Sequence, residues 1–496
     1  MLKAVRVEQR EIAIGKTLAD VDIKKPFDTG LEYGCPARGT WNIAHIGFLV
    51  PECHEVFVCA ANCLRGVVLT AAEMGTIGQF STVTIKENNV LDGNMEELLI
   101  DGITSIIEKL KTKPKAVLVY TSCIHHFMAV DLGLCYKTLR KRFPKIKFTD
   151  CYMNPIMRKS GITPDELMRR QLYTLIDKTD KKDNGINILG NNYPTDETSD
   201  LIRLIRKSKY KLRDITYCKK FSEYNDMGKS KINIAYLPVA KKGLDFISRK
   251  LDQEALYLPL SYDSEVIKKN MTLLAEKIGV DINKFDFKEE EAMAALNDAK
   301  KIIGNTAIAI DYTFTTAPFS LVKLLLDNGF NVKKIFTDSI GEVDVFNEIK
   351  EKYAGRDIKV YPTVNVSMRV NERGQKEKYL ALGQKAAYFT DTNYFVNEVE
   401  GGGHYGFDSI KILAKNMIDA YKKEKDASSL IQKKGLGCGC QLWNRYKHLQ
   451  VHIRQMSQVF HLHFTNLAAW VSCMMLQVVT LLIILMMNQG GMVVRA

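Results

Sequence analysis

Apolar stretches and amphipathic stretches alternate along most of this 496-residue chain. Residues 95–110 carry apolar side chains at helical spacing, and the run 116–120 that follows is apolar throughout, as in a buried strand. The alternation continues through residues 148–208, where strand, helix, strand and helix follow one another. Because helices separate the strands, this pattern predicts parallel sheets.

The most regular alternation lies between residues 290 and 390. It predicts helices at 290–301, 318–328 and 343–353, and strands at 306–310, 334–337, 358–361 and 387–390. This order is typical of a doubly wound sheet with helices on both faces. A shorter alternation over 231–278, which ends in a helix at 264–278, predicts a small unit of its own.

A chain of this length is too long for one hydrophobic core, so we expect several domains. The polar link 209–230 marks a boundary between the first and second of three α/β units in series. The expected parts are an N-terminal arm (1–33), a first α/β domain (34–215), a small middle α/β domain (231–288), a third α/β domain (289–425) and an atypical hydrophobic tail (441–496).

The tail differs from the rest of the chain in composition. Residues 467–487 are apolar except for Ser472, Gln477 and Thr480, and at about 1.5 Å per residue they would cross a bilayer core of about 30 Å. Basic residues upstream would keep the main body on the cytoplasmic side. The alternative is a readthrough or frame-shifted extension beyond a natural terminus at 435–440, and the sequence leaves both interpretations open.

The charge and the cysteine count narrow the class of protein. The formal net charge is +13, of which the tail supplies one Lys and three Arg, leaving +13 − 4 = +9 on the first 440 residues. Without zinc-finger spacing or a basic helix with interleaved aromatic residues, we expect no nucleic-acid partner. Eleven cysteines are too few for a disulfide scaffold, and the charged first ten residues are unlike a signal peptide, so we expect a cytoplasmic protein with reduced thiols.

The predicted strand-to-helix turns carry no nucleotide-binding loop. None of them has Gly-x-Gly-x-x-Gly, and Gly-x-x-x-x-Gly-Lys-Ser/Thr does not occur in the sequence, which argues against a dehydrogenase or a nucleotide hydrolase. Any use of ATP would therefore come from a partner. The glycines at 401–403 follow Glu398 and Glu400, whose charge would repel phosphate, so we expect a loop that needs close backbone approach.

Three cysteines stand at positions that suit a cluster ligand. Cys35 follows a glycine, Cys63 ends a segment that begins at Cys59, and Cys123 comes just after the strand predicted at 116–120. The carboxyl end of a parallel strand is where ligands bind. The wide spacing of Cys35, Cys63 and Cys123 is compatible with an iron–sulfur cluster held between loops, and three ligands invite a fourth from a second subunit.

The other thiols have simpler explanations. Free cysteine is among the most buried residue types, and we expect core thiols at Cys135, Cys151, Cys218 and Cys473. Cys53 remains open as a ligand, with His54 and Glu55 beside it expected at the surface. His125 and His126 follow Cys123 and are expected to cap the next helix. A zinc site would show paired Cys-x-x-Cys spacing, and only the terminal residues 438–440 come near it.

The segments at Gly34 and Cys35, at 59–63 and at 121–123 resemble the three cluster-ligand segments of nitrogenase component 1 subunits. Further segments are similar in order and spacing, namely 187–191, 212–215, 246–249 and 405–408, so that the resemblance covers about residues 30–425. It implies three Rossmann-like doubly wound domains and paired subunits that bridge an iron–sulfur cluster. It also implies a separate ATP-hydrolysing iron protein that delivers electrons.

The sequence departs from this family at the active-site cofactor. The position of the cysteine that binds the molybdenum–iron cofactor is Ala240 here, and the position of the histidine ligand is Tyr405. His404 lies one residue earlier and would substitute only if the loop shifted. These departures leave a molybdenum–iron type cofactor, and with it dinitrogen reduction, in doubt.

The resemblance therefore implies an oxidoreductase that is not a true nitrogenase. Its cofactor would be a 4Fe-4S or P-cluster-like centre on Cys35, Cys63 and Cys123, with Cys59 as the contender if the match is shifted by a turn. The expected partners are a second component 1-type subunit, an ATP-dependent iron protein and an unidentified small-molecule substrate between the three domains. A cofactor-assembly scaffold is the alternative, and a membrane-tethered binding module is a third.

Overall fold

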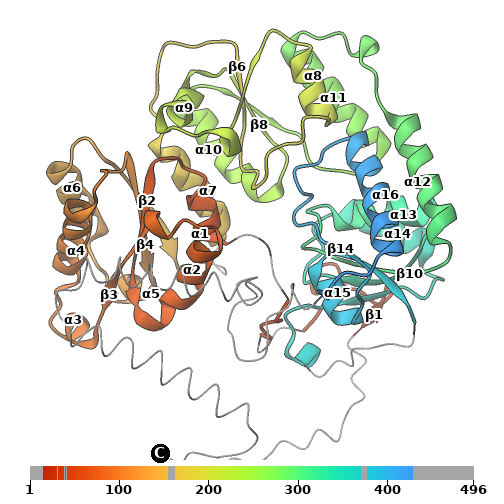
Figure 1. The fold of residues 1–496 in the computed structure, drawn as a ribbon, viewed down its shortest axis with the longest axis horizontal. Helices are drawn as coiled ribbons and strands as arrows, with labels where there is room; N and C mark the ends of the chain where they lie inside the picture. The colour runs from red at the N-terminus through yellow and green to blue at the C-terminus, as the bar shows by residue number, and fades with distance from the viewer. Residues whose placement is uncertain are drawn as a thin grey trace, which may run out of the picture.

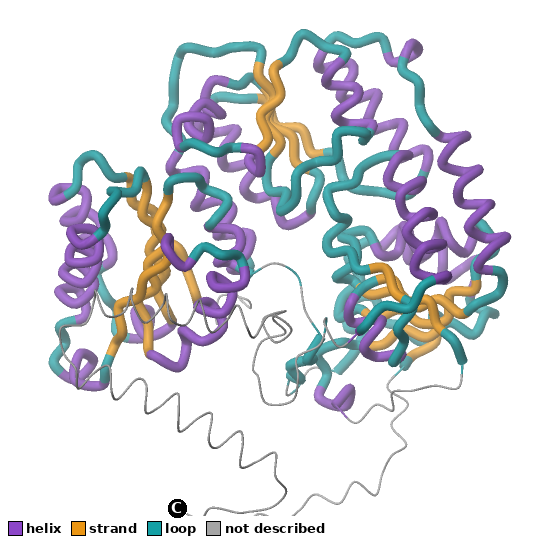
Figure 2. Tube along the Cα trace, viewed as in Figure 1, coloured by secondary structure: helices purple, strands orange, loops and turns teal. Residues whose placement is uncertain are grey.

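The computed structural model describes residues 15–28, 30, 32–37, 40, 42–154, 162–369, 377–427 and 430. These residues form three α/β units in series, each built on its own sheet. Figure 1 shows the first unit at the left, the second at the top and the third at the right, and Figure 2 shows helices around the strands of each. The predicted fold class, α/β with Rossmann-like parallel sheets, is confirmed.

The first unit contains a four-stranded parallel sheet in the order β3-β2-β4-β5. Its strands are β2 Cys53–Ala60, β3 Phe80–Ile85, β4 Ala116–Ser122 and β5 Lys147–Met153. Its helices are α1 Ile43–Gly47, α2 Ala61–Glu73, α3 Glu87–Leu91, α4 Met95–Lys109, α5 Cys123–Phe127, α6 Leu132–Arg142 and α7 Pro164–Leu172.

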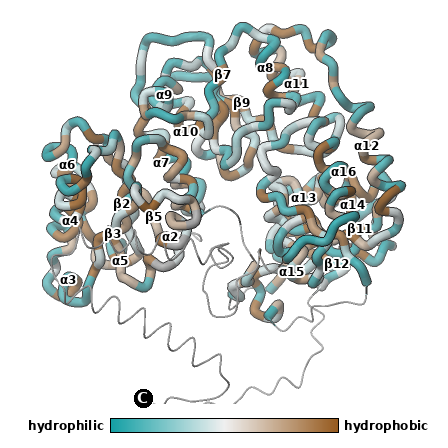
Figure 3. Tube along the Cα trace, viewed as in Figure 1, coloured by the Kyte–Doolittle hydropathy of each residue, from teal (hydrophilic) through white to brown (hydrophobic). Residues whose placement is uncertain are grey.

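Both faces of the first sheet are covered by helices. Because neighbouring residues on a strand point to opposite faces, Val56 and Val58 of β2 join one core with α4 and α6, whereas Phe57 and Cys59 join the other with α1, α2 and α7. β4 is buried along its whole length, which explains the continuous apolar run in the sequence. Figure 3 shows the apolar positions concentrated along the sheets and the helix faces beside them.

The second unit is a parallel sheet in the order β7-β6-β8-β9. Its strands are β6 Gly185–Ile188, β7 Lys211–Asp214, β8 Ile232–Ala235 and β9 Glu254–Tyr257. Its helices are α8 Asp200–Arg206, α9 Phe221–Asn225, α10 Lys241–Leu251 and α11 Ser264–Ile278.

The polar link at 209–230 lies within this second sheet, although the sequence predicts a domain boundary there. Ile186 of β6 is paired with Leu212 of β7 on one side and with Ile232 of β8 on the other. The link therefore contains β7 and connects it to β8 of the same sheet. Local polarity marks the connection as a loop, but strand pairing decides to which sheet its flanking strands belong.

The third unit has the sheet order β1-β12-β11-β10-β13-β14, parallel except for β1. Its strands are β1 Lys16–Thr17, β10 Ala307–Asp311, β11 Asn331–Phe336, β12 Lys359–Tyr361, β13 Tyr379–Leu382 and β14 Phe395–Val396. Its helices are α12 Glu289–Ile303, α13 Pro318–Asp327, α14 Val343–Tyr353, α15 Gln384–Thr390 and α16 Phe407–Lys422. The strand order reverses between β10 and β13, which makes this pair the topological switch point.

One predicted strand of the third unit is wrong. Residues 387–390 belong to helix α15, and the strand is β13, which ends at Leu382. Gly383, with a φ of +110°, turns the chain between strand and helix, and the Asp311 carboxylate accepts a hydrogen bond from the Ala386 N–H. A short apolar run does not separate a buried strand from a buried helix by its pattern alone.

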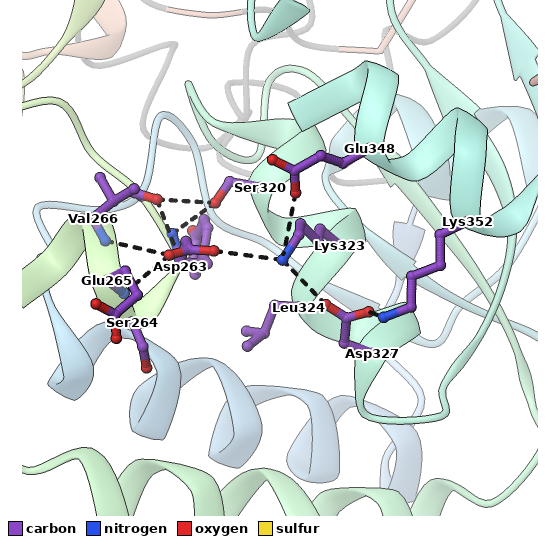
Figure 4. A network of polar contacts seen from close by, with 12 residues as sticks. Asp263, Ser264, Glu265, Val266, Ser320, Lys323, Leu324, Asp327, Glu348 and Lys352 are labelled. Atoms are coloured by element: carbon purple, nitrogen blue, oxygen red, sulfur yellow. Dashed lines mark hydrogen bonds and ion pairs between the residues drawn. The ribbon is translucent and has the colours of Figure 1, made fainter. Parts of the chain in front are cut away.

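Ion pairs join the second and third units where α11 begins. The Asp263 carboxylate caps α11 and also lies 3.5 Å from the Nζ of Lys323 on α13. Lys323 pairs further with Asp327 at 3.3 Å and Glu348 at 3.8 Å, and Lys352 joins Asp327 from α14 (Figure 4). These side chains are partly exposed, so the network is a modest contribution to the contact between the units.

In the part of the chain that the structure describes, no helix is long and apolar enough to cross a membrane. The apolar run at 467–487 lies outside the described residues.

Candidate functional site

Three cysteines gather at the carboxyl edge of the first sheet. Cys59 is near the end of β2, Cys63 is in the first turn of α2, and Cys123 is the first residue of α5, directly after β4. β2 and β4 are paired in parallel with Val58 opposite Thr121, so both strands deliver their cysteines to the same edge. This edge is the usual ligand-binding end of a parallel sheet.

The three thiols differ in exposure but interact electrostatically. Cys59 is fully buried, Cys123 is half-buried and Cys63 is exposed. Burial raises the pKa of the Cys59 thiol to about 12, and the charges of Cys63 and Cys123 add to this increase. Cys59 therefore lies within electrostatic range of both other thiols.

A capping box fixes the start of α5 and with it the position of Cys123. The Ser122 N–H donates a hydrogen bond to His125 Nδ1 at 3.2 Å, and His125 is buried. Because Nδ1 accepts, the proton of the neutral ring is on Nε2, and burial lowers the pKa of this histidine. The prediction that His125 caps the helix is confirmed, whereas His126 is exposed.

Cys35 lies elsewhere. It packs against the core of the third unit and is close enough to Lys385 to affect that residue's charge. Burial alone would lower the pKa of Lys385, but Tyr312, Cys35 and Asp311 outweigh burial and raise it. The structure thus brings Cys59, and not Cys35, to the edge that holds Cys63 and Cys123.

The backbone next to Cys35 shows why the sequence could not place it. The Tyr33 N–H donates to the Val364 carbonyl at 2.7 Å, and Glu32 forms an antiparallel bridge with Asn365. These contacts hold the segment before Cys35 on the third unit. They join residues more than 330 positions apart, for which the local pattern around Cys35 holds no signal.

The remaining described cysteines fit a structural role. Cys53, Cys135 and Cys151 are buried, and Cys218 is half-buried. His54 and Glu55, expected at the surface, are buried as well, because β2 is an inner strand covered on both faces. Burial raises the pKa of the Glu55 carboxyl, which accepts a hydrogen bond from the Tyr120 hydroxyl. Cys438, Cys440 and Cys473 lie outside the described residues.

The arrangement of the thiols bears on the kind of metal that they could bind. Among the described residues, no three His, Cys, Asp or Glu side chains converge on a point where they could hold one metal ion. A zinc ion needs its thiolates about 2.3 Å from a single centre. A cluster spreads its thiolate ligands over several irons, so the separated thiols at this edge fit a polynuclear cluster better than a single ion.

The position that the resemblance assigns to the cofactor cysteine is closed. Ala240 is 1% exposed, and its methyl group packs on Gly190, where an added Cβ would come within 2.2 Å of it. Alanine has no metal-binding atom. This site therefore does not fit a molybdenum–iron type cofactor.

The second assigned position is also occupied by other contacts. The buried Tyr405 hydroxyl donates to the Leu258 carbonyl at 3.2 Å and accepts from the Asn270 amide at 2.9 Å. His404 faces Asp196, with 3.9 Å between Nδ1 and the carboxylate, and burial lowers the pKa of this histidine. None of these contacts directs the side chain of Tyr405 or His404 toward Ala240.

Polar side chains connect the three units near Ala240. The buried Arg169 of α7 donates to the Gly190 carbonyl at 2.5 Å, to Asn192 Oδ1 at 2.9 Å and to the Asp165 carboxylate at 2.8 Å. The Asn192 amide in turn donates to Glu400 of the third unit. The sequence predicts that substrate lies between the three units. At this junction, however, protein side chains form a hydrogen-bonded network.

The glycine-rich loop follows this network. Gly401, Gly402 and Gly403 all have positive φ angles, and a Cβ on Gly403 would lie 2.1 Å from the Pro194 carbonyl oxygen. The prediction of a loop that needs close backbone approach is confirmed.

A polar group at the carboxyl edge of the third sheet was not predicted from the sequence. The buried Lys385 donates to the Tyr312 hydroxyl at 2.7 Å and to Thr363 Oγ1 at 3.2 Å. Tyr312 follows β10 and Lys385 follows β13, so the group lies at the topological switch point. Tyr312 comes two residues after the strand predicted at 306–310, which is the signal that the sequence offers for this group, but β13, which precedes Lys385, was not predicted.

Comparison with known proteins agrees with this fold. A sequence model of the family "Nitrogenase component 1 type Oxidoreductase" matches residues 49–407. The solved structure "Nitrogenase Cp1 at pH 6.5" has a TM-score of 0.60 and 14% identity, and the match covers 80% of this chain and 95% of that one. "Nitrogenase Cp1 at pH 5" has a TM-score of 0.47 and 13% identity over 82% of this chain and 93% of that one. No curated protein sequence matches the chain.

The family match includes β2, β4 and the carboxyl edge on which Cys59, Cys63 and Cys123 lie, and it continues through all three sheets to Phe407. It spans well over half of the chain. The protein therefore belongs to the nitrogenase component 1 type oxidoreductases.

Proposed function

We propose that this chain is a nitrogenase-like reductase subunit that accepts electrons from an ATP-dependent iron protein through an iron–sulfur cluster. The family supports a metal–sulfur cofactor, and the gathering of Cys59, Cys63 and Cys123 at one sheet edge is the observation that carries the proposal. When bound, the cluster would supply one-electron transfer. The chain's own residues supply thiolates and shield one side of the site from water.

The surroundings of the edge support a protein partner. Phe127, the last residue of α5, is 70% exposed, and Met128 after it is 41% exposed. Leu134, at the start of α6, is 52% exposed. Exposed apolar side chains on the elements that follow Cys123 are typical of a surface that another protein covers. A second component 1-type subunit is the partner that we propose for this surface.

The first experiment is anaerobic purification followed by iron and sulfide analysis. We expect a brown protein with about 2 to 4 iron atoms per chain, as for a thiolate-bound cluster shared with a partner. A folded protein that stays colourless and free of iron after reconstitution would refute the proposal.

The second experiment tests electron transfer. Since the sequence has no Gly-x-x-x-x-Gly-Lys-Ser/Thr loop, we expect the partner to hydrolyse ATP. We expect the cluster to be reduced only when both ATP and the iron protein are present. Omitting ATP from the same mixture is the matched control, and equal reduction with and without ATP would contradict the proposed role.

One observation favours a second function, a cofactor-assembly scaffold. Ala240 is packed against Gly190 and the nearby junction is crossed by the Arg169 network, so the region that would hold an active-site cofactor is closed. A scaffold keeps the fold and binds a cluster in transit without turning over a substrate.

Two measurements distinguish these functions. Transfer of a bound cluster to an apo-protein, without ATP-dependent substrate reduction, would support the scaffold. ATP-dependent reduction of a small molecule with the cognate iron protein, without net loss of iron from the chain, would support the reductase.

A further inference from the structure

We propose that Arg170 binds the oxyanion group, a carboxylate or a phosphate, of a small-molecule ligand where the first and second units meet. Arg170 is in the last turn of α7 in the first unit, and α7 packs on α10 of the second unit (Figure 1). The site uses none of the cysteines, so it goes beyond the proposed function and is tested independently of it.

Arg170 differs from the other arginines that the fold covers. Among the described side chains, the buried or half-buried arginines are Arg169, Arg170, Arg203 and Arg213. The other three each pair with an aspartate, at a distance of 2.8 Å for Arg169 and 2.9 Å for Arg203. Arg170 makes no hydrogen bond or ion pair with any described residue, and its Nε is buried without a partner.

The chemistry of the guanidinium makes this isolation informative. An arginine stays charged and carries five N–H donors, so removing it from water without giving it an acceptor costs free energy. The central carbon of the Arg170 guanidinium lies 5.5 Å from the ring centroid of Phe246 on α10. This contact occupies a face of the guanidinium and leaves the N–H groups along its edge. Carboxylates and phosphates are the groups that accept two parallel N–H bonds from such an edge.

An aspartate close to Arg170 does not serve as the acceptor. The Asp150 carboxylate on β5 accepts hydrogen bonds from the Tyr152 hydroxyl and from the Gln171 side-chain amide. Burial and Asp150 raise the pKa of Tyr152, and the charge of Arg170 offsets part of this increase, so Arg170 lies within electrostatic range of the pair. Neutral donors thus bind the oxygens of Asp150, and an acceptor for Arg170 would come from outside the described chain.

The surroundings on α10 favour an anion. Lys242 is exposed and comes four residues before Phe246, so both lie on the same side of the helix. The Phe246 ring is partly buried and packs against the core, which fixes the surface that carries the guanidinium. The positive charges of Lys242 and Arg170 would both attract an oxyanion that approaches between α7 and α10.

Titration of the full-length protein with two simple probes tests this site. Isothermal titration calorimetry uses sodium phosphate and, separately, sodium succinate, with sodium chloride added to keep the ionic strength constant. We expect wild-type protein to bind at least one probe saturably, with one site per chain. Arg170→Met should raise the dissociation constant by about 10- to 100-fold, because it removes charge-assisted hydrogen bonds.

Two further variants separate the fork of donors from the charge. Arg170→Lys keeps the charge but not the planar fork, so its dissociation constant should lie between those of the wild type and Arg170→Met. Arg249→Met is the matched control, because Arg249 is an exposed arginine of α10 whose Nε donates to the Asp245 carbonyl of its own helix at 3.1 Å. This variant should bind the probes as the wild type does.

The outcomes distinguish the kind of oxyanion and the validity of the site. Saturable binding of phosphate alone identifies a phosphorylated ligand, and binding of succinate alone identifies a carboxylate. No saturable binding of either probe to the wild type, an unchanged dissociation constant in Arg170→Met, or equal weakening in Arg249→Met would overturn the proposal. Circular dichroism checks folding, and Arg170→Lys replaces Arg170→Met if the latter does not fold. Iron content should be the same in all variants, so failure of this site leaves the proposed function standing.

Discussion

Replacement of Arg169 by methionine tests the polar junction between the three units. Methionine keeps an unbranched stem but removes the guanidinium, which is 1% exposed. The Gly190 carbonyl and Asn192 Oδ1 then lose their donor in a buried environment. Asp165 is 28% exposed and is solvated in part.

The magnitude follows from these contacts. Each buried acceptor left without a donor costs about 1–3 kcal/mol, so the two together cost about 2–6 kcal/mol. This range agrees with the cost of about 3–5 kcal/mol for breaking a buried ion pair. In a cooperative unit of about 150–250 residues, a loss of about 3–5 kcal/mol corresponds to a melting temperature lower by about 6–20 °C.

Differential scanning calorimetry at fixed protein concentration measures this shift. Arg170→Met is the matched control, because Arg170 is the next residue of the same helix and stacks on Phe246, with 5.5 Å to the ring centroid. Such a contact is worth about 0.5–1 kcal/mol at a partly exposed site. If Arg169→Met melts within the error of Arg170→Met, the junction does not depend on the guanidinium and the reasoning is refuted.

Three further predictions concern the second and third units. Gly403→Ala should lower the melting temperature, since its Cβ would meet the Pro194 carbonyl and its φ is +85°; an unchanged calorimetric trace would contradict the close approach. Burial raises the pKa of the Glu342 carboxyl to about 7, above its value in the unfolded chain, so its contribution to stability grows as the pH falls from about 7 toward 4.5. Glu342→Gln should therefore reduce the pH dependence of the urea denaturation midpoint between these pH values. An unchanged slope of midpoint against pH would contradict this prediction. Lys323→Met should lower the free energy of unfolding in urea by about 1 kcal/mol, and by less in high salt. Lys301→Met removes an exposed ion pair and should leave the free energy of unfolding unchanged within error.

Much of the secondary structure could be predicted from the sequence. Helices α11 and α14 have their predicted bounds, and β4 continues only two residues beyond the predicted run 116–120. These elements have a strong helical period or a continuous apolar run, and such signals are local. The strand predicted at 387–390 failed because four apolar or small residues have no period that separates strand from helix.

The candidate site was predicted in part. The sequence singled out Cys63 and Cys123 because each stands at the end of a predicted element, and the structure has both at one sheet edge. It ranked Cys35 above Cys59, since a glycine precedes Cys35 and Cys59 looks like an ordinary strand residue. Where Cys59 and Cys35 lie in the fold depends on the pairing of β2 with β4 and on the contact of Tyr33 with Val364.

The sequence by itself therefore determined most of the strand and helix order, the family, and which cysteines to consider as iron ligands. The tertiary structure decided which cysteines lie at one sheet edge, which strands share a sheet, and that Glu55 and Ala240 are buried in closed surroundings. The physical reason is the range of the interactions. Periodicity acts over neighbouring residues, whereas strand pairing and burial join residues that are distant in the chain and come together only in the folded protein.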